Sequence, residues 1–182
     1  AASFPKLLPK FDDVFRRHNQ DYTIVVVNDG STDNSLEILA NYSQTMPIRI
    51  VNHALNRGLG ETERDGFEYI ASLCADQDIV IRMDCDDTHE PEYTFRLVEK
   101  ILAGSDVVIA SRFQPGGGQL GLNGYRTAVS LAANLFMKIV FPMAGVKDYS
   151  CGYRAYRGEA LKTAVGVFGN GFKGAAWQTA RQ

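Results

Sequence analysis

The sequence predicts an α/β protein with a mostly parallel sheet and helices on both faces of that sheet. Three observations indicate this fold class. Short apolar runs, many of them β-branched, alternate with longer segments in which apolar residues recur every three or four positions. Polar clusters rich in Asp, Asn and Gly directly follow several of the apolar runs. The length of 182 residues and the 45% hydrophobic content are typical of one globular domain.

The first part of the chain predicts a helix and then a strand. Apolar residues recur at helical spacing at positions 4, 7, 8, 11, 14 and 15. Residues 23–27 (TIVVV) are mostly β-branched, as expected of a strand that is buried on both faces. The turn at 28–33 (NDGSTD) leads into a second helix, which Ser31 or Asp33 can cap at its start.

The rest of the chain continues this alternation. Pro91 suits the first turn of a helix. We expect further strands at 48–51, 78–83, 106–110 and 153–156, and further helices from 61 to about 73, from 91 to about 102, over roughly 126–141 and near 159–165. Helices between strands act as crossovers, so the strands should run largely parallel. Ligands bind beyond the carboxyl ends of such strands, and the polar clusters at 28–33, 84–87 and 110–113 therefore predict one shared site.

The net charge of −2 conceals an uneven distribution of charge along the chain. Residues 1–111 contain ten basic and nineteen acidic residues, whereas residues 112–182 contain nine basic and two acidic ones. This division suggests two kinds of ligand chemistry on one protein, although chance also distributes surface charge unevenly. The acidic part would repel a phosphate backbone, so we expect no nucleic-acid partner.

Cysteine content and hydropathy bear on the compartment. The three cysteines are widely spaced and form neither a disulfide framework nor a paired metal motif, which favours a reducing, cytoplasmic compartment. The apolar stretch 130–146 is interrupted by Asn134, Lys138 and Pro142. We therefore expect a core helix there, or a helix on a membrane surface, in place of a membrane span.

Asp84 and Asp86 stand one residue apart, directly after the apolar run at 78–83. Two carboxylates in a turn at the end of a strand can bind a hard divalent cation, which predicts Mg²⁺ or Mn²⁺. The alternative is a solvated acidic turn. His89 has no companion ligands at a usable spacing, so zinc is not expected.

Other polar residues near strand ends are candidates for binding a phosphorylated ligand. The Asp29 carboxylate can accept a hydrogen bond from a base or ribose, and it can equally stabilise its own turn. Arg64 follows the NRGLG loop by one helical turn and could reach a diphosphate or be an ordinary exposed arginine. The arginines that could bind a phosphate through paired, charge-assisted hydrogen bonds are Arg112, Arg126 and Arg154.

Five motifs in order carry a resemblance to a known family. They are VVVNDGSTDNS, NRGLG, MDCDD followed two residues later by EPE, DVVIASRF and DYSCGYRAYR. Together they resemble glycosyltransferase family 2 and, within it, the polyprenyl-phosphate synthases of the dolichyl-phosphate mannose or glucose type. The resemblance covers the chain from about residue 4 to about residue 160. It implies a GT-A fold, a nucleotide-diphosphate-sugar donor, a divalent metal and inversion at the anomeric carbon.

The resemblance also implies roles for individual residues. Asp29 matches a position that contacts the base, and Arg64 matches one near the donor. Asp84 and Asp86 match the positions that bind the metal and the diphosphate. The arginines that match the binding site of the acceptor's phosphate are Arg112 and Arg126, to which the basic cluster described above adds Arg154.

The sequence departs from the family pattern at several positions. These are Asn28 (usually Asp), Asp87 and Thr88 (usually Leu-Gln), and Glu61 and Glu63 (usually small or apolar). The family's first strand, which lies at the centre of the sheet, is also missing. We therefore expect residues 1–182 to be a single glycosyltransferase domain that is incomplete at both ends. In the complete protein we expect a cytoplasmic location, peripheral to or anchored at the membrane.

The expected function is metal-dependent transfer of a sugar to a dolichyl or undecaprenyl phosphate. A sugar hydroxyl normally needs a carboxylate base, and no Asp or Glu follows Glu159 in this sequence. A lipid phosphate needs no base because it is already anionic. Two alternatives stay open. One is a family 2 enzyme with a saccharide hydroxyl acceptor in cell-wall or polysaccharide synthesis, and the other is a nucleotide-sugar-binding pseudoenzyme.

Overall fold

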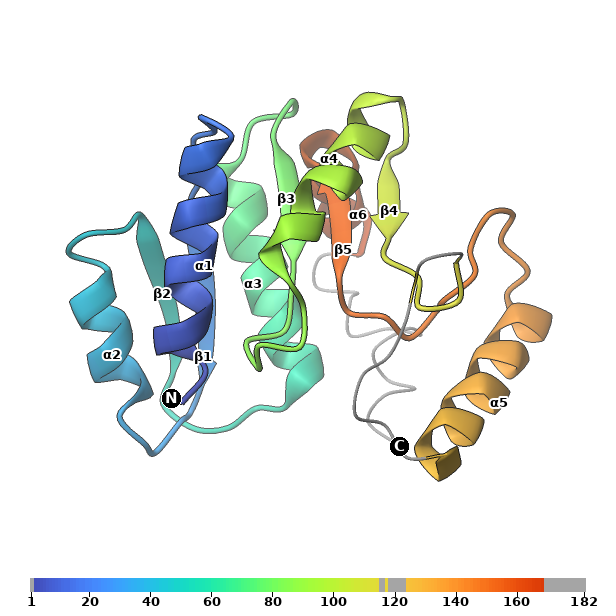
Figure 1. Cartoon of the computed structure of the whole chain (residues 1–182), viewed down its shortest axis with the longest axis horizontal. Coiled ribbons are helices and arrows are strands. Elements are labelled where there is room, and N and C mark those ends of the chain that lie inside the picture. Colours follow the sequence, from blue (N-terminus) through green and yellow to red (C-terminus); the bar gives the residue numbers. More distant parts are fainter. Residues whose placement is uncertain (1, 115–116, 118–123, 169–182) are drawn as a thin grey trace.

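Figure 1 shows the computed structural model of the chain, which describes residues 2–114, 117 and 124–168, without the side chains of residues 124–127 and 168. In chain order, the elements of this part are α1 (Phe4–Arg17), β1 (Ile24–Asp29), α2 (Ser35–Tyr42), β2 (Ile48–His53), α3 (Leu59–Leu73), β3 (Ile79–Arg82), η1 (Pro91–Tyr93), α4 (Thr94–Leu102), β4 (Val107–Ile109), α5 (Gly124–Val140), β5 (Arg154–Arg157) and α6 (Gly158–Phe168). Each strand and helix that we predicted is present. The fold class is therefore confirmed.

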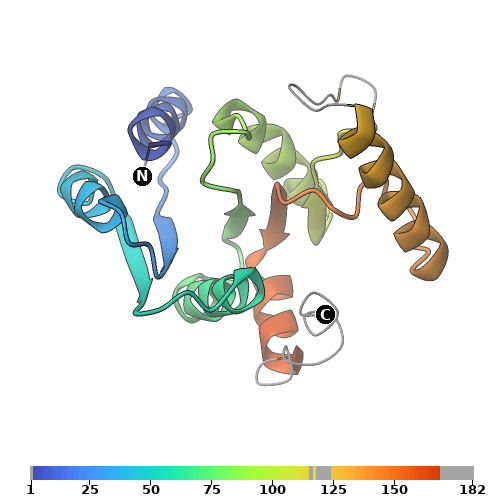
Figure 2. The ribbon, with the colours of Figure 1, turned by 90° about the horizontal axis from the view of Figure 1, so that it is seen from below.

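Helices cover both faces of the strands. In Figure 2, α1 and α4 lie on one side of the strands, whereas α3 and α6 lie on the other. The amphipathic pattern explains how α1 packs, since its buried residues include Phe4, Leu7, Leu8 and Val14. Full burial of a side chain of this size contributes about 1.5–3 kcal/mol. The apolar stripe at the start of the chain thus fixes α1 onto the strands.

The strands form two separate sheets. β1 pairs in parallel with β2, with Ile24 opposite Ile48 and Asp29 opposite His53. In the second sheet β5 lies between β3 and β4 and runs antiparallel to both. The sequence pattern did not reveal this reversal. β5 begins near the carboxyl end of β4 and runs back beside it. An antiparallel strand of this kind needs no crossover helix.

An apolar cavity of about 750 Å³ separates the two sheets. Residues of β1 and β3, such as Val25 and Val80, line it together with side chains of α1 and α4. Within the described ranges β1 pairs with β2 alone and β3 with β5 alone, so both strands have an edge without a strand partner. This division lies between β1 and β3.

The carboxyl ends of β1, β2, β3 and β4 all point to the lower edge in Figure 1. The polar segments that follow these strands therefore gather along one edge, as the alternation of strands and helices predicted. Two buried clusters hold helices against the strands. One joins α1, β1 and α2 around Phe4, Val26 and Leu39, and the other joins α4 and β5 around Ile101 and Ala155.

The prediction that the apolar stretch 130–146 forms a core helix is wrong. α5 stands away from both sheets in Figures 1 and 2, and many of its large apolar side chains are exposed. Apolar residues cover most of this helix apart from the line of Ser130, Asn134 and Lys138, and the pattern alone did not show whether the apolar part is buried within the protein or exposed. In the described part of the chain, the faces of the second sheet are covered by α4 and α6 instead.

Candidate active site

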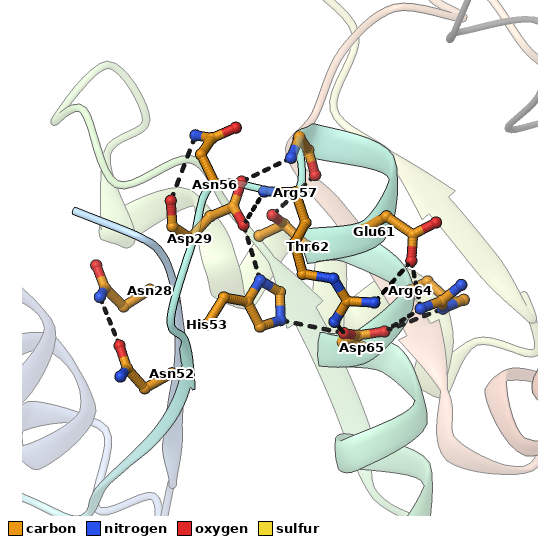
Figure 3. A network of polar contacts seen from close by, with 11 residues as sticks. Asn28, Asp29, Asn52, His53, Asn56, Arg57, Glu61, Thr62, Arg64 and Asp65 are labelled. Carbon is orange, nitrogen blue, oxygen red and sulfur yellow. Dashed lines mark hydrogen bonds and ion pairs between the residues drawn. The ribbon is translucent and has the colours of Figure 1, made fainter.

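The carboxylate of Asp29, at the end of β1, holds the loop that connects β2 to α3 (Figure 3). Its Oδ1 accepts a hydrogen bond from the backbone N–H of Arg57 at 2.8 Å, and its Oδ2 accepts one from the N–H of Gly58 at 2.9 Å. The same Oδ1 lies 2.7 Å from Nδ1 of His53. Burial alone would raise the pKa of Asp29, but the hydrogen bonds from His53, Arg57 and Gly58 outweigh burial and lower the pKa. Asp29 is therefore an ionised anchor for the glycine loop.

The turn after β1 packs directly on the same loop. Gly30 has a φ of 68°, and a Cβ at this position would collide with the backbone N of Asn56. Only glycine combines this backbone conformation with so close an approach. Next to the turn, Asn28 Nδ2 donates a hydrogen bond to Asn52 Oδ1 at 2.7 Å. Asn28 stands where the family usually has Asp, and here it joins the ends of β1 and β2.

A buried histidine that the sequence analysis did not select lies at the centre of this region. The His53 side chain is only 5% exposed, and its Nε2 lies 3.1 Å from Oδ2 of Asp65 on α3. This contact is close but is not an aligned hydrogen bond. Asp65 also binds Arg57, whose Nη1 lies 2.5 Å from Oδ2. His53 thus connects the end of β2 to both β1 and α3.

Arg64, the other residue predicted near the donor, is bound by acidic neighbours on α3. Its Nε and Nη2 donate to Asp65 Oδ1 at 3.0 and 2.7 Å, and Nη2 also pairs with Glu61. The hydrogen bond to Asp65 raises the pKa of Arg64, so the guanidinium stays charged. The arginine and Asp29 are parts of one network, as Figure 3 shows. Their predicted contacts with a donor stay predictions.

The acidic loop after β3 is held by hydrogen bonds within the loop and by an ion pair with α1. Asp86 Oδ1 accepts hydrogen bonds from the backbone N–H and the hydroxyl of Thr88, at 3.1 and 2.6 Å. Burial raises the pKa of Asp86, but the two hydrogen bonds from Thr88 outweigh it and lower the pKa. Asp87 has a φ of 63° and pairs with Lys10 of α1 at 3.0 Å. Asp86 is therefore ionised in a loop that α1 helps to hold.

Asp84 is paired with an arginine of the preceding strand. Arg82 Nη1 lies 2.7 Å from Asp84 Oδ1, and Arg82 Nη2 pairs with Glu63 of α3. Gly152 makes room for this arrangement, since a Cβ there would collide with Arg82 Nη1 and lie 2.9 Å from Asp84 Oδ2. A charged residue inside the apolar strand at 78–83 is the sequence signal that could have pointed to Arg82.

The carboxylates of Asp84 and Asp86 match the oxygen ligands that Mg²⁺ and Mn²⁺ prefer. No group of three or more His, Cys, Asp or Glu side chains that could hold a metal ion occurs in the part of the chain that the structure describes. Two carboxylates are nevertheless sufficient for Mg²⁺ where substrate phosphates and waters supply the other ligands. The residues present therefore fit a cation that binds together with a diphosphate.

Arg112 lies just after β4 and is fixed by a buried carboxylate. Asp148, whose side chain is fully buried, accepts hydrogen bonds from Arg112 Nε at 2.7 Å and Nη2 at 2.9 Å. Ser150 Oγ accepts a further bond from Arg112 Nη2 at 2.5 Å. Burial would raise the pKa of Asp148, but the hydrogen bonds from Arg112 outweigh it and lower the pKa. Asp148 is the first residue of the DYSCGYR motif. An acidic residue in a part of the chain that is otherwise basic is the sequence signal that could have pointed to it.

The other two predicted arginines are placed differently. The Arg154 guanidinium donates to the carbonyl oxygens of Cys151 and Tyr149, both at 2.8 Å, so it supports the turn before β5. Arg126 lies in the first turn of α5, but its side chain is outside the described residues. Contacts in the structure therefore explain the positions of Arg112 and Arg154, and the prediction for Arg126 lies outside the described side chains.

His89 lies beside the acidic loop, with its Nε2 4.0 Å from Oδ2 of Asp84. Burial lowers the pKa of His89, while the negative charges of Asp84 and Asp86 raise it and the positive charges of Arg82 and Arg112 lower it. The His89 ring also stacks on Tyr153 of the CGYR segment, with 5.1 Å between ring centroids. The acidic loop after β3 and the segment before β5 thus meet at the His89 ring. That the polar clusters at 28–33, 84–87 and 110–113 form one shared site stays a prediction.

Exposed apolar residues mark a different part of the molecule. Those on α5 and the segment after it are Val129, Leu131, Leu135, Phe136, Met137, Ile139, Val140, Phe141 and Met143. Asn134 attaches α5 to the following segment, because it donates to Lys147 O and accepts from Tyr149 N, both at 2.8 Å. Among the described residues, no helix is both long and apolar enough to cross a membrane.

Comparison with known proteins places the chain among sugar-transferring enzymes. The family model described as "Glycosyl transferase family 2" matches residues 3–164. A polyprenol monophosphomannose synthase of Mycolicibacterium smegmatis is 34% identical over 76% of this chain and 52% of that protein. A dolichol-phosphate mannosyltransferase of Pyrococcus furiosus is 31% identical over 86% of this chain and 43% of its own length. An undecaprenyl-phosphate mannosyltransferase of Micrococcus luteus is 30% identical over 82% of this chain and 62% of its own length. The chain spans about half the length of these relatives.

Proposed function

Because the chain belongs to glycosyl transferase family 2, we propose that its protein transfers a sugar from a nucleotide-diphosphate sugar to a polyprenyl phosphate, with inversion at the anomeric carbon. The observation that carries this proposal is that Asp84, Asp86 and Arg112 follow β3 and β4, whose carboxyl ends lie at one edge of the strands. Two carboxylates and an arginine at one sheet edge suit a donor diphosphate with its cation and an anionic acceptor beside it.

The donor side of the site consists of residues at the ends of β1 and β2. Asp29 holds the backbone of Arg57 and Gly58 at the edge where ligands of such sheets bind. Arg64 lies one turn further along α3 and brings a positive charge to the same network. In this proposal the loop fixes the position of the nucleotide, and Asp29 and Arg64 are its donor-binding residues.

The acidic loop is the proposed binding site of the divalent cation. Asp84 and Asp86 would hold Mg²⁺ or Mn²⁺ through their carboxylate oxygens. When bound there, the cation supplies neutralising charge for the leaving nucleoside diphosphate. Arg82 pairs with one oxygen of Asp84 and limits how this carboxylate can turn.

The acceptor side is built on Arg112. Asp148 fixes the orientation of its guanidinium, so binding a phosphate costs less side-chain entropy. A lipid phosphate is already anionic near neutral pH and can attack without a carboxylate that removes a proton. Arg126 and Arg154 complete the acceptor site in this proposal, although Arg154 acts chiefly through the turn that it supports.

The same proposal places the protein at a membrane surface on its cytoplasmic side. The acceptor is a lipid, and the exposed apolar side chains of α5 offer a surface that could enter the interface of a bilayer. Nine basic residues against two acidic ones in 112–182 would favour an anionic membrane. The acceptor would then reach Arg112 from this side.

The experiment is a transfer assay with the protein, radiolabelled GDP-mannose or UDP-glucose, and undecaprenyl or dolichyl phosphate in detergent. We expect labelled lipid in the presence of Mg²⁺ or Mn²⁺, and its loss with EDTA or with Asp86→Ala. Asp106→Ala removes an exposed carboxylate far from the acidic loop in sequence and serves as a control. Transfer only to free saccharides would support the hydroxyl-acceptor alternative. Nucleotide binding by calorimetry without any transfer would indicate a pseudoenzyme.

A further inference from the structure

His53 lies between two carboxylates from different elements, as Figure 3 shows. Its Nδ1 is 2.7 Å from Oδ1 of Asp29 at the end of β1, and its Nε2 is 3.1 Å from Oδ2 of Asp65 on α3. The side chain is 5% exposed, so water does not screen these contacts as it would at the surface. The ring therefore connects two strands and one helix at the edge of the first sheet.

Each carboxylate in turn holds part of the loop that leads into α3. Asp29 accepts the backbone N–H groups of Arg57 and Gly58. Asp65 accepts a hydrogen bond from Arg57 Nη1 at its Oδ2 and one from Arg64 Nη2 at its Oδ1. The loop backbone and its arginine are thus attached from both sides of one imidazole ring. Removal of the ring would leave two carboxylates facing each other across a buried space.

The loop also has contacts that do not involve the Asp29 carboxylate. Gly30 packs on the Asn56 backbone, and the Gly58 carbonyl accepts hydrogen bonds from the N–H and the hydroxyl of Thr62 at 3.1 and 3.0 Å. Asn56 Nδ2 donates to the carbonyl oxygen of Asp29 at 3.3 Å, which is a long hydrogen bond. The N–H groups of Arg57 and Gly58 both donate to the Asp29 carboxylate, so the orientation of this carboxylate affects the position of the loop backbone.

We propose that His53 is a positioning residue for the nucleotide side of the site: it orients Asp29 and Asp65, and through them the backbone at 56–58. This inference rests on the proposed function for the identity of the ligand. His53 does not touch the reacting atoms in this proposal. Its effect is on the affinity for the nucleotide part of the donor and on the order of the loop, and much less on the chemical step.

Two variants and a matched control test the proposal. His53→Gln keeps a side chain of similar length that can donate to one carboxylate but not to both. Asp65→Asn keeps the histidine and removes the charge next to Nε2. His18→Gln makes the same exchange at an exposed histidine that stacks on Phe95 and lies outside the network. All three proteins are compared with the parent by calorimetry with GDP and UDP, and by hydrogen–deuterium exchange without nucleotide.

We expect His53→Gln to weaken binding of the preferred nucleotide about tenfold, the effect of losing one charged hydrogen bond. The peptide containing residues 55–60 should exchange faster, while peptides of α4 and β5 should not change. Asp65→Asn should act in the same direction and His18→Gln should have no effect. In the transfer assay, KM for the donor should rise more than kcat falls.

A purely structural role predicts a different result. His53→Gln would then lower the melting temperature and speed exchange throughout the protein, with unchanged nucleotide affinity and unchanged KM, and the proposal would be overturned. If His53→Gln does not fold, Asp65→Asn alone gives the same two readouts. If the parent binds neither nucleotide, the proposed function fails, while local exchange at residues 55–60 still supports or overturns the positioning role of His53.

Discussion

Arg112 donates three hydrogen bonds to Asp148, from Nε at 2.7 Å, from Nη2 at 2.9 Å and from its backbone N–H at 3.3 Å, and the Asp148 side chain is fully buried. The backbone N–H groups of Ser150 and Cys151 donate to the same carboxylate, both at 3.2 Å. One buried aspartate thus fixes both the proposed acceptor arginine and the start of the segment that leads to β5. The contact joins residues that are far apart in the sequence, and it can be tested by substitution.

Asp148→Ala should destabilise the protein, since it leaves the Arg112 guanidinium and the backbone N–H groups of Arg112, Ser150 and Cys151 without this acceptor. We expect the free energy of unfolding to fall by about 2 kcal/mol, measured by chemical denaturation. Asp106→Ala is the matched control, because Asp106 pairs with Arg157 at 3.0 Å but its side chain is 73% exposed. The control should lose less than about 1 kcal/mol. Equal losses in both variants would contradict the importance of burial.

The same pair should contribute to acid sensitivity. The pKa of Asp148 is lowered from its ordinary value of 3.8, so the folded protein binds fewer protons at this group than the unfolded chain. Its stabilising contribution is complete above pH 3.8 and is lost as the pH falls through the lowered pKa. We expect the difference in unfolding free energy between the parent and Asp148→Asn to shrink below about pH 3.8. A constant difference from pH 7 to pH 3 would contradict this assignment.

Gly152→Ala should disturb the acidic loop through Arg82. The added Cβ would collide with Arg82 Nη1 and crowd Asp84, so the guanidinium must leave its place between Asp84 and Glu63. We expect at least a tenfold loss of transfer activity and a loss of about 1–3 kcal/mol in stability. Gly166→Ala in α6 is the control, since its Cβ would meet nothing within 4 Å and alanine favours the helix. Full activity of Gly152→Ala would show that the position of Arg82 is not important.

The exposed apolar face of α5 predicts binding to lipid. Phe136 and Ile139 are 63% and 70% exposed, and charged residues there would have to enter the bilayer interface. Phe136→Glu with Ile139→Glu should lower binding to vesicles that contain anionic phospholipid about tenfold or more, as measured by flotation. Leu102→Glu, at a 73% exposed residue at the end of α4, should bind as the parent does. Unchanged flotation of the double variant would exclude α5 as the lipid-binding surface.

Local pattern was sufficient for most of the fold. The β-branched run that became β1 and the amphipathic repeat that became α1 were both predicted, because each depends on neighbours within one element. Two features were not. The reversed direction of β5 depends on the end of β3 and β4 at which the chain enters between them. The exposure of α5 depends on which faces of the sheets other helices already cover.

The site divides in the same way. Asp29, Asp84 and Asp86 were selected because their motifs follow apolar runs, and the structure places them at strand ends on one edge. The partners that orient them were missed, since contacts such as His53 with Asp65 join residues whose spacing follows no helical or strand repeat. A histidine or an arginine in such a place looks like any other polar residue until its surroundings are known.

The sequence by itself determined the order of strands and helices, the family and the motifs at the ends of the strands. Periodicity and turn chemistry act over a few residues, and they are readable along the chain. Only the tertiary structure decided what holds these motifs: His53 between Asp29 and Asp65, Arg82 beside Asp84, and Asp148 beneath Arg112. These pairs form because packing removes water and brings residues that are distant in the sequence within hydrogen-bonding distance. Burial then strengthens the electrostatic interaction within each pair.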